Sequence, residues 1–180
     1  MAKPRTVDML LADRVKLFEL MQTATDFIVA VVVTAYLDAS LELLLRSRFQ
    51  NSKAADELLD DNRPLASFGA RYHAARAIGL IDETAYGDLK QIGKIRDRFA
   101  HYHLALDFGD QEIVDRCREL SLSEHTFDHN TGEIICVVPR TSESLYARTR
   151  FLMMASYYSG RFLQGAGCSS LPPSSTQLTS

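Results

Sequence analysis

The first half of this 180-residue chain contains almost no residue that interrupts a helix. No glycine occurs before Gly69, and no proline lies between Pro4 and Pro64. Because glycine and proline are the strongest local breakers of regular structure, their absence favours long helices. Tryptophan is absent from the whole chain, so nine phenylalanines and seven tyrosines must supply the aromatic part of any core.

Cysteine is scarce and follows no recognisable pattern. Cys117, Cys136 and Cys168 are odd in number and include no CxxC pair. A disulfide framework requires paired cysteines, and a typical zinc site requires them closely spaced. The pattern predicts reduced thiols in a cytoplasmic protein.

The chain also lacks a basic excess and a run of apolar residues long enough for a membrane. Its net charge of −3 argues against tight non-specific binding of nucleic acid through a broad basic surface. The most apolar stretch, FIVAVVVTAYL, lies between Asp26 and Asp38 and is far shorter than the about 20 residues of a spanning helix. Charged residues interrupt the N-terminal apolar run, so we expect neither a secretory signal nor a membrane segment.

Helical periodicity and capping residues dominate what is present. They predict helices over residues 6–21, 26–50, 51–63, 64–79, 82–106, 110–120 and 142–163. Apolar residues on nearly every side of the second helix predict that it is the buried centre of a bundle. In the first helix, Leu10, Leu11, Val15 and Phe18 predict one apolar face.

One segment has a different pattern. Around residues 125–138, β-branched and aromatic residues flank polar turn residues, which predicts a small β-hairpin that turns at Asn130–Gly132 and stops at Pro139. Residues 166–180 are small, polar and proline-rich, which predicts a disordered tail. The expected fold class is all-α: a multi-helix bundle in a single domain over residues 1–165, with one hairpin.

The segment 91–103, QIGKIRDRFAHYH, carries the residues most suggestive of function. Lys90, Lys94 and Arg98 are four residues apart and form a basic ridge, a candidate binding surface. Asp97 and His101 are also one helical turn apart, so the carboxylate can orient the imidazole.

Arg96 lies at the edge of the apolar stripe of the same helix and has two interpretations. Arginine binds phosphate in bidentate fashion and an oriented histidine moves protons, so Arg96, Asp97 and His101 together would suit metal-free cleavage of a phosphodiester. Alternatively, Arg96 forms structural ion pairs with Asp38 and Glu42, which are one turn apart on the buried second helix. We favour the structural interpretation.

Other candidate sites are weaker. His125, His129 and Cys136 suggest a metal, but a turn separates the histidines and a fourth ligand is not apparent, so we expect no metal. Residues 74–89 imitate a helix-turn-helix, yet the second helix is too apolar to read DNA. We find no cofactor motif.

Three segments together resemble the mannitol operon repressor family: LELLLRSRFQ (41–50), ELLDDNRPLASFGARYHAARAIGLID (57–82) and YGDLKQIGKIRDRFAH (86–101). The resemblance implies an all-α transcriptional regulator of a sugar-alcohol operon with no recognised DNA-binding motif of its own. The run RDRFAH also resembles the Arg-polar-x3-His motif of HEPN domains, helical bundles that include metal-independent ribonucleases and toxins. Arg96, Asp97 and His101 match that motif, although Asp97 stands where asparagine is frequent.

Three functional hypotheses follow. The first, which we favour, is a cytoplasmic, non-enzymatic regulator that acts through a protein partner or as a homodimer and does not itself read DNA. The second is a HEPN-like ribonuclease or toxin. The third is a structural dimer module of a larger assembly, in which Arg96 serves only the fold.

Overall fold

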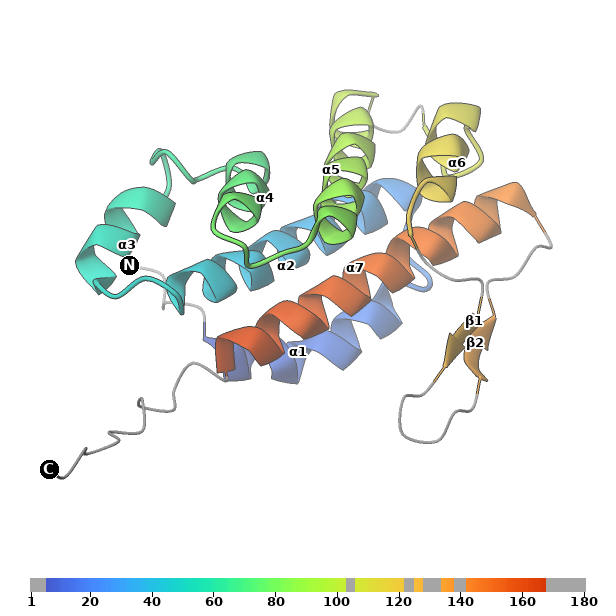
Figure 1. Cartoon of the computed structure of the whole chain (residues 1–180). Helices are drawn as coiled ribbons and strands as arrows, with labels where there is room; N and C mark the ends of the chain where they lie inside the picture. Colours follow the sequence, from blue (N-terminus) through green and yellow to red (C-terminus); the bar gives the residue numbers. More distant parts are fainter. Residues whose placement is uncertain (1–5, 103–105, 122–124, 128–133, 138–141, 168–180) are drawn as a thin grey trace, which may run out of the picture.

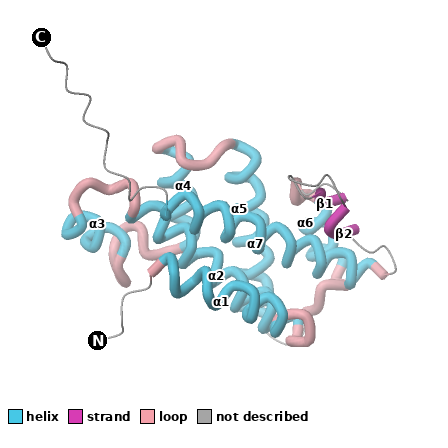
Figure 2. The backbone as a smooth tube through the Cα atoms, turned by 90° about the horizontal axis from the view of Figure 1, so that it is seen from below, coloured by secondary structure: helices cyan, strands magenta, loops and turns pink. Residues whose placement is uncertain are grey.

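The computed structural model describes residues 6–102, 106–121, 125–127, 134–137 and 142–167. Most of this part is helical, with loops between the helices, as Figure 2 shows. The seven helices are α1 (Val7–Leu20), α2 (Asp26–Arg46), α3 (Ser52–Leu59), α4 (Phe68–Ala77), α5 (Glu83–Tyr102), α6 (Gln111–Arg118) and α7 (Glu143–Gly167). The predicted all-α bundle is confirmed. The seventh helix extends two residues past the predicted domain boundary at 165, and residues 168–180 lie outside the described part.

Two short strands lie at one end of the bundle (Figure 1). β1 (His125–Phe127) pairs antiparallel with β2 (Ile134–Val137), and His125 stands opposite Val137. The predicted turn at 130–132, the stop at residue 139 and His129 lie outside the described residues. The strands are an appendage and contribute nothing to the layers of helices.

Side-chain caps decide where several helices begin. The hydroxyl of Thr6 accepts a hydrogen bond from the Met9 amide at 3.3 Å, as predicted for the first helix. The fourth helix begins at Phe68 and not at Pro64, because Ser67 is the cap and accepts from the Ala70 amide at 3.2 Å. The serine hydroxyl can accept a hydrogen bond from an amide in the first turn of the helix. Proline, three residues earlier, has no side-chain acceptor and cannot act as this cap.

The second and seventh helices form the centre of the bundle. In Figure 1, α2 and α7 run side by side, with α1 on one side of them and α4, α5 and α6 crossing on the other. The second helix is long and apolar enough to cross a membrane by length and composition alone, but most of its apolar stretch is packed inside the bundle. It ends at Arg46, four residues before the predicted end.

α2 lies at the centre of the bundle, as predicted, but its first half is not covered on every side. Ile28 and Val32 remain 42% and 37% exposed, and Ala35 is also exposed. Together with the half-buried Val31 they form an uncovered strip, here called the α2 stripe. The residues follow a spacing of three and four, so they share one face of the helix.

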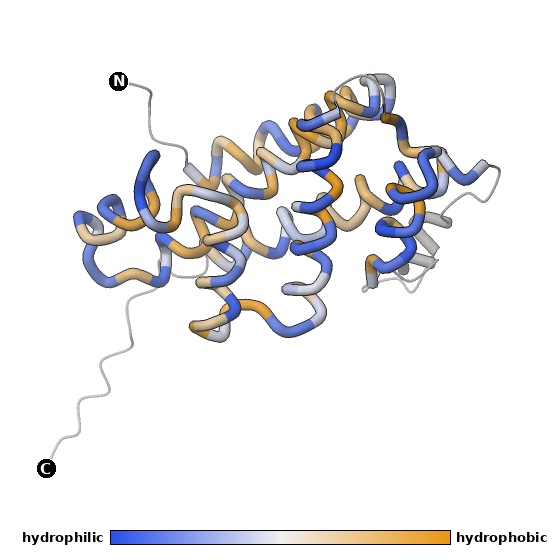
Figure 3. Tube along the Cα trace, turned by 90° about the horizontal axis from the view of Figure 1, so that it is seen from above, coloured by the Kyte–Doolittle hydropathy of each residue, from blue (hydrophilic) through white to orange (hydrophobic). Residues whose placement is uncertain are grey.

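The first helix packs loosely. It contains no fully buried residue, and Leu11 and Val15, expected on its apolar face, are 41% and 66% exposed. Figure 3 shows hydrophilic and hydrophobic residues interspersed along the helices. The helix is held by polar contacts: Arg14 donates to the Ser156 carbonyl at 3.0 Å, and the Tyr36 hydroxyl donates to the Leu10 carbonyl at 2.6 Å.

Candidate functional site

The residues predicted to carry chemistry all lie on α5, but the structure does not bring them together. The Arg96 side chain is 36% exposed, and its Nε lies 3.2 Å from Oδ1 of Asp97 in a geometry that makes no hydrogen bond. His101 is exposed and makes no contact with Asp97 within the described residues. The predicted carboxylate–imidazole pair, which was to orient the histidine, is therefore not formed in this chain.

The basic ridge of the same helix is only partly available. Lys90 and Lys94 are exposed, and neither forms an ion pair within the described part of the chain. Arg98 instead pairs with Glu112 of α6 at 2.5 Å and lies over the ring of Tyr102, 4.4 Å from its centre. The ridge therefore offers two ammonium groups to a partner, and the third cation joins α5 to α6.

The cation that pairs with both Asp38 and Glu42 of α2 is Arg71, and the prediction that assigned this role to Arg96 is wrong. Glu42 also pairs with Arg46 on its own helix, at 2.8 Å. Nη1 of Arg71 lies 2.9 Å from Asp38, and Nη2 lies 2.9 Å from Glu42. Nη2 also donates to the Leu59 carbonyl at 2.9 Å. The sequence held a usable signal, because Phe68, Arg71 and Ala75 are spaced as one face of α4 and all three are buried.

Asp38 remains incompletely satisfied despite this pairing. Its Oδ1 is buried and accepts no hydrogen bond. Burial raises the pKa of the carboxyl, and the hydrogen bond and charge of Arg71 oppose that rise. The Nε of Arg96 is likewise buried without a hydrogen bond. Both atoms therefore have unused hydrogen-bonding capacity, although Arg96 Nε lies beside the Asp97 carboxylate. The two side chains themselves are 23% and 36% exposed, so each can still be reached by a bound group.

Both groups line a pocket of about 260 Å³ between α2, the start of α4 and α5. Val31 and Ala35 of the α2 stripe, together with Phe68, form its apolar wall, and Asp38 and Arg96 supply its polar groups. We call these five residues the α2–α5 groove. Its apolar wall continues into the exposed part of the stripe. An apolar surface with a few polar groups is typical of a site that binds another protein.

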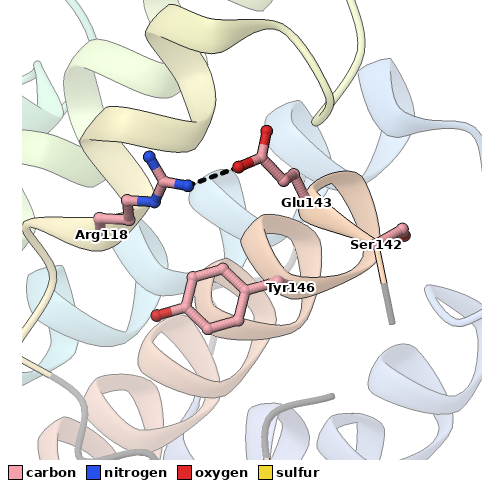
Figure 4. Close-up of a pocket in the computed structure, with 4 residues that line it drawn as sticks. All are labelled: Arg118, Ser142, Glu143 and Tyr146. Atoms are coloured by element: carbon pink, nitrogen blue, oxygen red, sulfur yellow. Dashed lines mark hydrogen bonds and ion pairs between the residues drawn. The ribbon is translucent and has the colours of Figure 1, made fainter. Parts of the chain in front are cut away.

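A second pocket, of about 300 Å³, lies between the end of α6 and the start of α7 (Figure 4). Arg118 and Glu143 meet across it in an ion pair of 2.6 Å, with Tyr146 beside them. The lining therefore carries one positive and one negative charge, so it presents no net charge to an ionic ligand.

The described residues contain no candidate metal site, and Cys117 is not a reactive thiol. They contain no group of three or more His, Cys, Asp or Glu side chains placed to hold a metal ion. Cys117 is fully buried, and burial raises the pKa of its thiol to about 12. A thiol in that state is a packing residue, because the thiolate is the nucleophile.

The fold and groove define a class: an all-helical protein whose most distinctive surface suits a protein partner. Comparison with known proteins adds the family. Residues 13–137 match the family model of the mannitol repressor, MtlR, and the chain belongs to that family. No match was found among curated proteins.

A solved structure supports the fold independently. The chain resembles the X-ray structure of the MtlR–HPr complex from Escherichia coli, with a TM-score of 0.64 and 17% sequence identity. The match covers 84% of this chain and 98% of the other. At this level of identity the likeness establishes a shared fold, and the partner is a property of the Escherichia coli protein.

Proposed function

We propose that this chain is a cytoplasmic transcriptional regulator of a sugar-alcohol operon that acts by binding another protein, and that it binds that protein through the α2–α5 groove. Membership of the mannitol repressor family supports the regulatory role. The observation that carries the proposal is the α2 stripe, because Ile28 and Val32 stay partly exposed beside a pocket that is also lined by Asp38 and Arg96.

The residues of the groove indicate what kind of surface a partner must present. Covering the stripe would remove apolar surface from water, at about 25 cal/mol per Å² before the costs of association. The partly exposed Asp38 side chain would accept a hydrogen bond, and the partly exposed Arg96 side chain would donate one. A partner should therefore insert an apolar side chain next to a donor and an acceptor. HPr is the first candidate, since the structurally similar Escherichia coli protein was solved in complex with it. A second copy of this chain is the competing occupant.

Calorimetric titration with HPr from the same organism tests the proposal. We expect Ile28→Glu and Val32→Glu to weaken binding by at least about tenfold, because each places a carboxylate on a surface that must become dry. Ile78→Glu is the matched control: Ile78 is 53% exposed, just after α4 and outside the groove, so this variant should bind normally.

Two results would contradict the proposal. One is the absence of HPr binding by the wild-type chain together with tight, sequence-specific DNA binding. The other is an equal loss of affinity in the Ile78→Glu control. Sedimentation of the free protein identifies the competing occupant: a dimer that Val32→Glu dissociates, without any HPr binding, would assign the groove to a second copy.

The HEPN-like ribonuclease is the alternative function, and one observation favours it: Arg96 lines an accessible pocket on the helix that also carries Asp97 and His101. Arg96 and His101 are five residues apart on α5, which directs their side chains roughly 140° apart. A catalytic pair would therefore need a second copy of the chain. This alternative predicts RNA cleavage that Arg96→Ala and His101→Ala each abolish. Uncut RNA at high protein concentration, with several sequences tested, would eliminate it.

A further inference from the structure

A separate and larger pocket, of about 400 Å³, lies where the α4–α5 turn meets α2 and α7. Its volume falls in the range of sites for small molecules, roughly 300–1,000 Å³. The protein-binding groove described above shares no lining residue with it. Three arginines from three parts of the chain line it: Arg48 after α2, Arg76 in the last turn of α4, and Arg161 of α7.

Two of these arginines have no acidic partner within the described residues. Arg48 donates to the Gly165 carbonyl at 3.3 Å, and Arg161 donates to the Tyr157 hydroxyl at 3.3 Å. Both contacts are with neutral groups, so neither neutralises the positive charge. The two guanidinium groups are therefore available to an anion.

The third arginine forms an ion pair that is exposed to water and therefore weak. Two nitrogens of Arg76 lie 3.0 Å from one carboxylate oxygen of Glu83, whose side chain is 76% exposed. An exposed pair of this kind contributes little and exchanges readily with a bound anion. Asp82 is the single acid in the pocket lining, and its carboxylate already caps α5 by accepting from the Ala85 amide at 2.8 Å. Three arginines and one aspartate give the lining a formal charge of +2, and Glu83 beside Arg76 lowers the local charge to +1.

The remaining wall is apolar and rigid. Leu44, Leu80 and Phe162 line the pocket beside the buried Tyr158. The Tyr158 hydroxyl donates to Asp88 at 2.6 Å, and Asp88 also accepts from the Ser121 amide at 2.9 Å. These hydrogen bonds hold the Tyr158 ring in place, so the apolar part of the pocket is formed before a ligand binds.

We propose that this pocket binds a small phosphate monoester. The phosphate group carries close to two negative charges, and Arg48 and Arg161 offer two guanidinium groups that donate to neutral groups. Guanidinium groups bind phosphate oxygens in bidentate fashion. The organic part packs against Leu80 and Phe162. Phosphate-ester binding and protein binding use different residues and are therefore independent of each other. Binding at this pocket makes the protein responsive to a phosphorylated metabolite.

Isothermal titration of the full chain with glucose 6-phosphate and glycerol 3-phosphate tests this, with inorganic phosphate and glucose as comparison ligands. We expect at least one ester to bind about tenfold more tightly than inorganic phosphate, and glucose not to bind. Arg48→Gln and Arg161→Gln should each weaken ester binding by about tenfold, because each removes one charge-assisted contact. Arg63→Gln is the matched control: Arg63 is an exposed arginine outside the pocket, and its loss should leave the affinity unchanged.

Three results would overturn the inference: no binding of either ester at millimolar concentration, equal affinity for ester and inorganic phosphate, or the same loss in Arg63→Gln as in the pocket variants. Thermal melts of each variant confirm that it is folded. Titration of Arg161→Gln with HPr keeps the two proposals distinct, since this variant should lose ester binding and retain any HPr binding.

Discussion

Arg71 joins three helices through one buried guanidinium. From α4 it reaches Asp38 and Glu42 of α2 and the carbonyl of Leu59 at the end of α3. The side chain is only 7% exposed, so little water is available to replace these contacts. Arg96, by contrast, has a loosely arranged partner on its own helix and a partly open position. The same residue type therefore plays a structural role at one site and remains available for contacts at the other.

This contrast predicts opposite results for two alanine variants. Arg71→Ala should lower the free energy of unfolding by about 3 kcal/mol, because the Asp38 carboxylate loses its ion pair while Glu42 keeps only the one with Arg46. Arg96→Ala should change it by less than about 1 kcal/mol, because its ion pair is partly exposed. Urea denaturation of the two variants beside the wild type measures both. Equal destabilisation would mean that Arg96 also supports the acids of α2.

Helix boundaries follow local chemistry at the scale of the element. Asn51, Ser67 and Asp82 each accept a hydrogen bond from an amide in the first turn of the helix that follows. α4 also ends as the sequence indicates, since Gly79 adopts a positive φ of 74° just after it. Thr25 precedes α2 without a side-chain cap, so the entry to the longest apolar segment depends on packing instead.

Two cap variants test this difference. Ser67→Ala should cost about 1 kcal/mol of stability, because the Ala70 amide loses its acceptor. Thr25→Ala should cost clearly less, since its hydroxyl makes no capping hydrogen bond. Chemical denaturation at one pH compares the two. A larger loss of stability in Thr25→Ala would contradict this prediction. It would mean that the Thr25 side chain supports the first turn of α2 through a contact other than a capping hydrogen bond.

For the molecule as a whole, the covering helices determine which surfaces stay open. α1 lies along one side of the α2–α7 pair, and α4, α5 and α6 cross the other. Neither set of helices covers the α2 stripe, so the apolar residues Ile28 and Val32 face solvent beside the groove. Where the α4–α5 turn meets α2 and α7, the same arrangement leaves the arginine-lined pocket. Each proposed site lies between helices and is lined by residues from more than one of them.

The sequence by itself determined the helices and the family. Periodic apolar residues, caps and the absence of breakers are local properties, so most helices could be located within a few residues, as at Thr6 and Asp82. Motifs spread over 41–101 were sufficient to indicate the mannitol repressor family, which the match over residues 13–137 established.

Only the tertiary structure decided how charges pair and which apolar residues stay uncovered. Arg71 and Arg96 both lie on helices that pack near α2, and sequence spacing cannot measure which guanidinium reaches Asp38. The three arginines of the larger pocket are more than 25 residues apart along the chain, so no local pattern could group them. Such contacts depend on how whole helices cross. Packing brings together residues that are far apart in the sequence, and the local sequence around each residue does not indicate its partner.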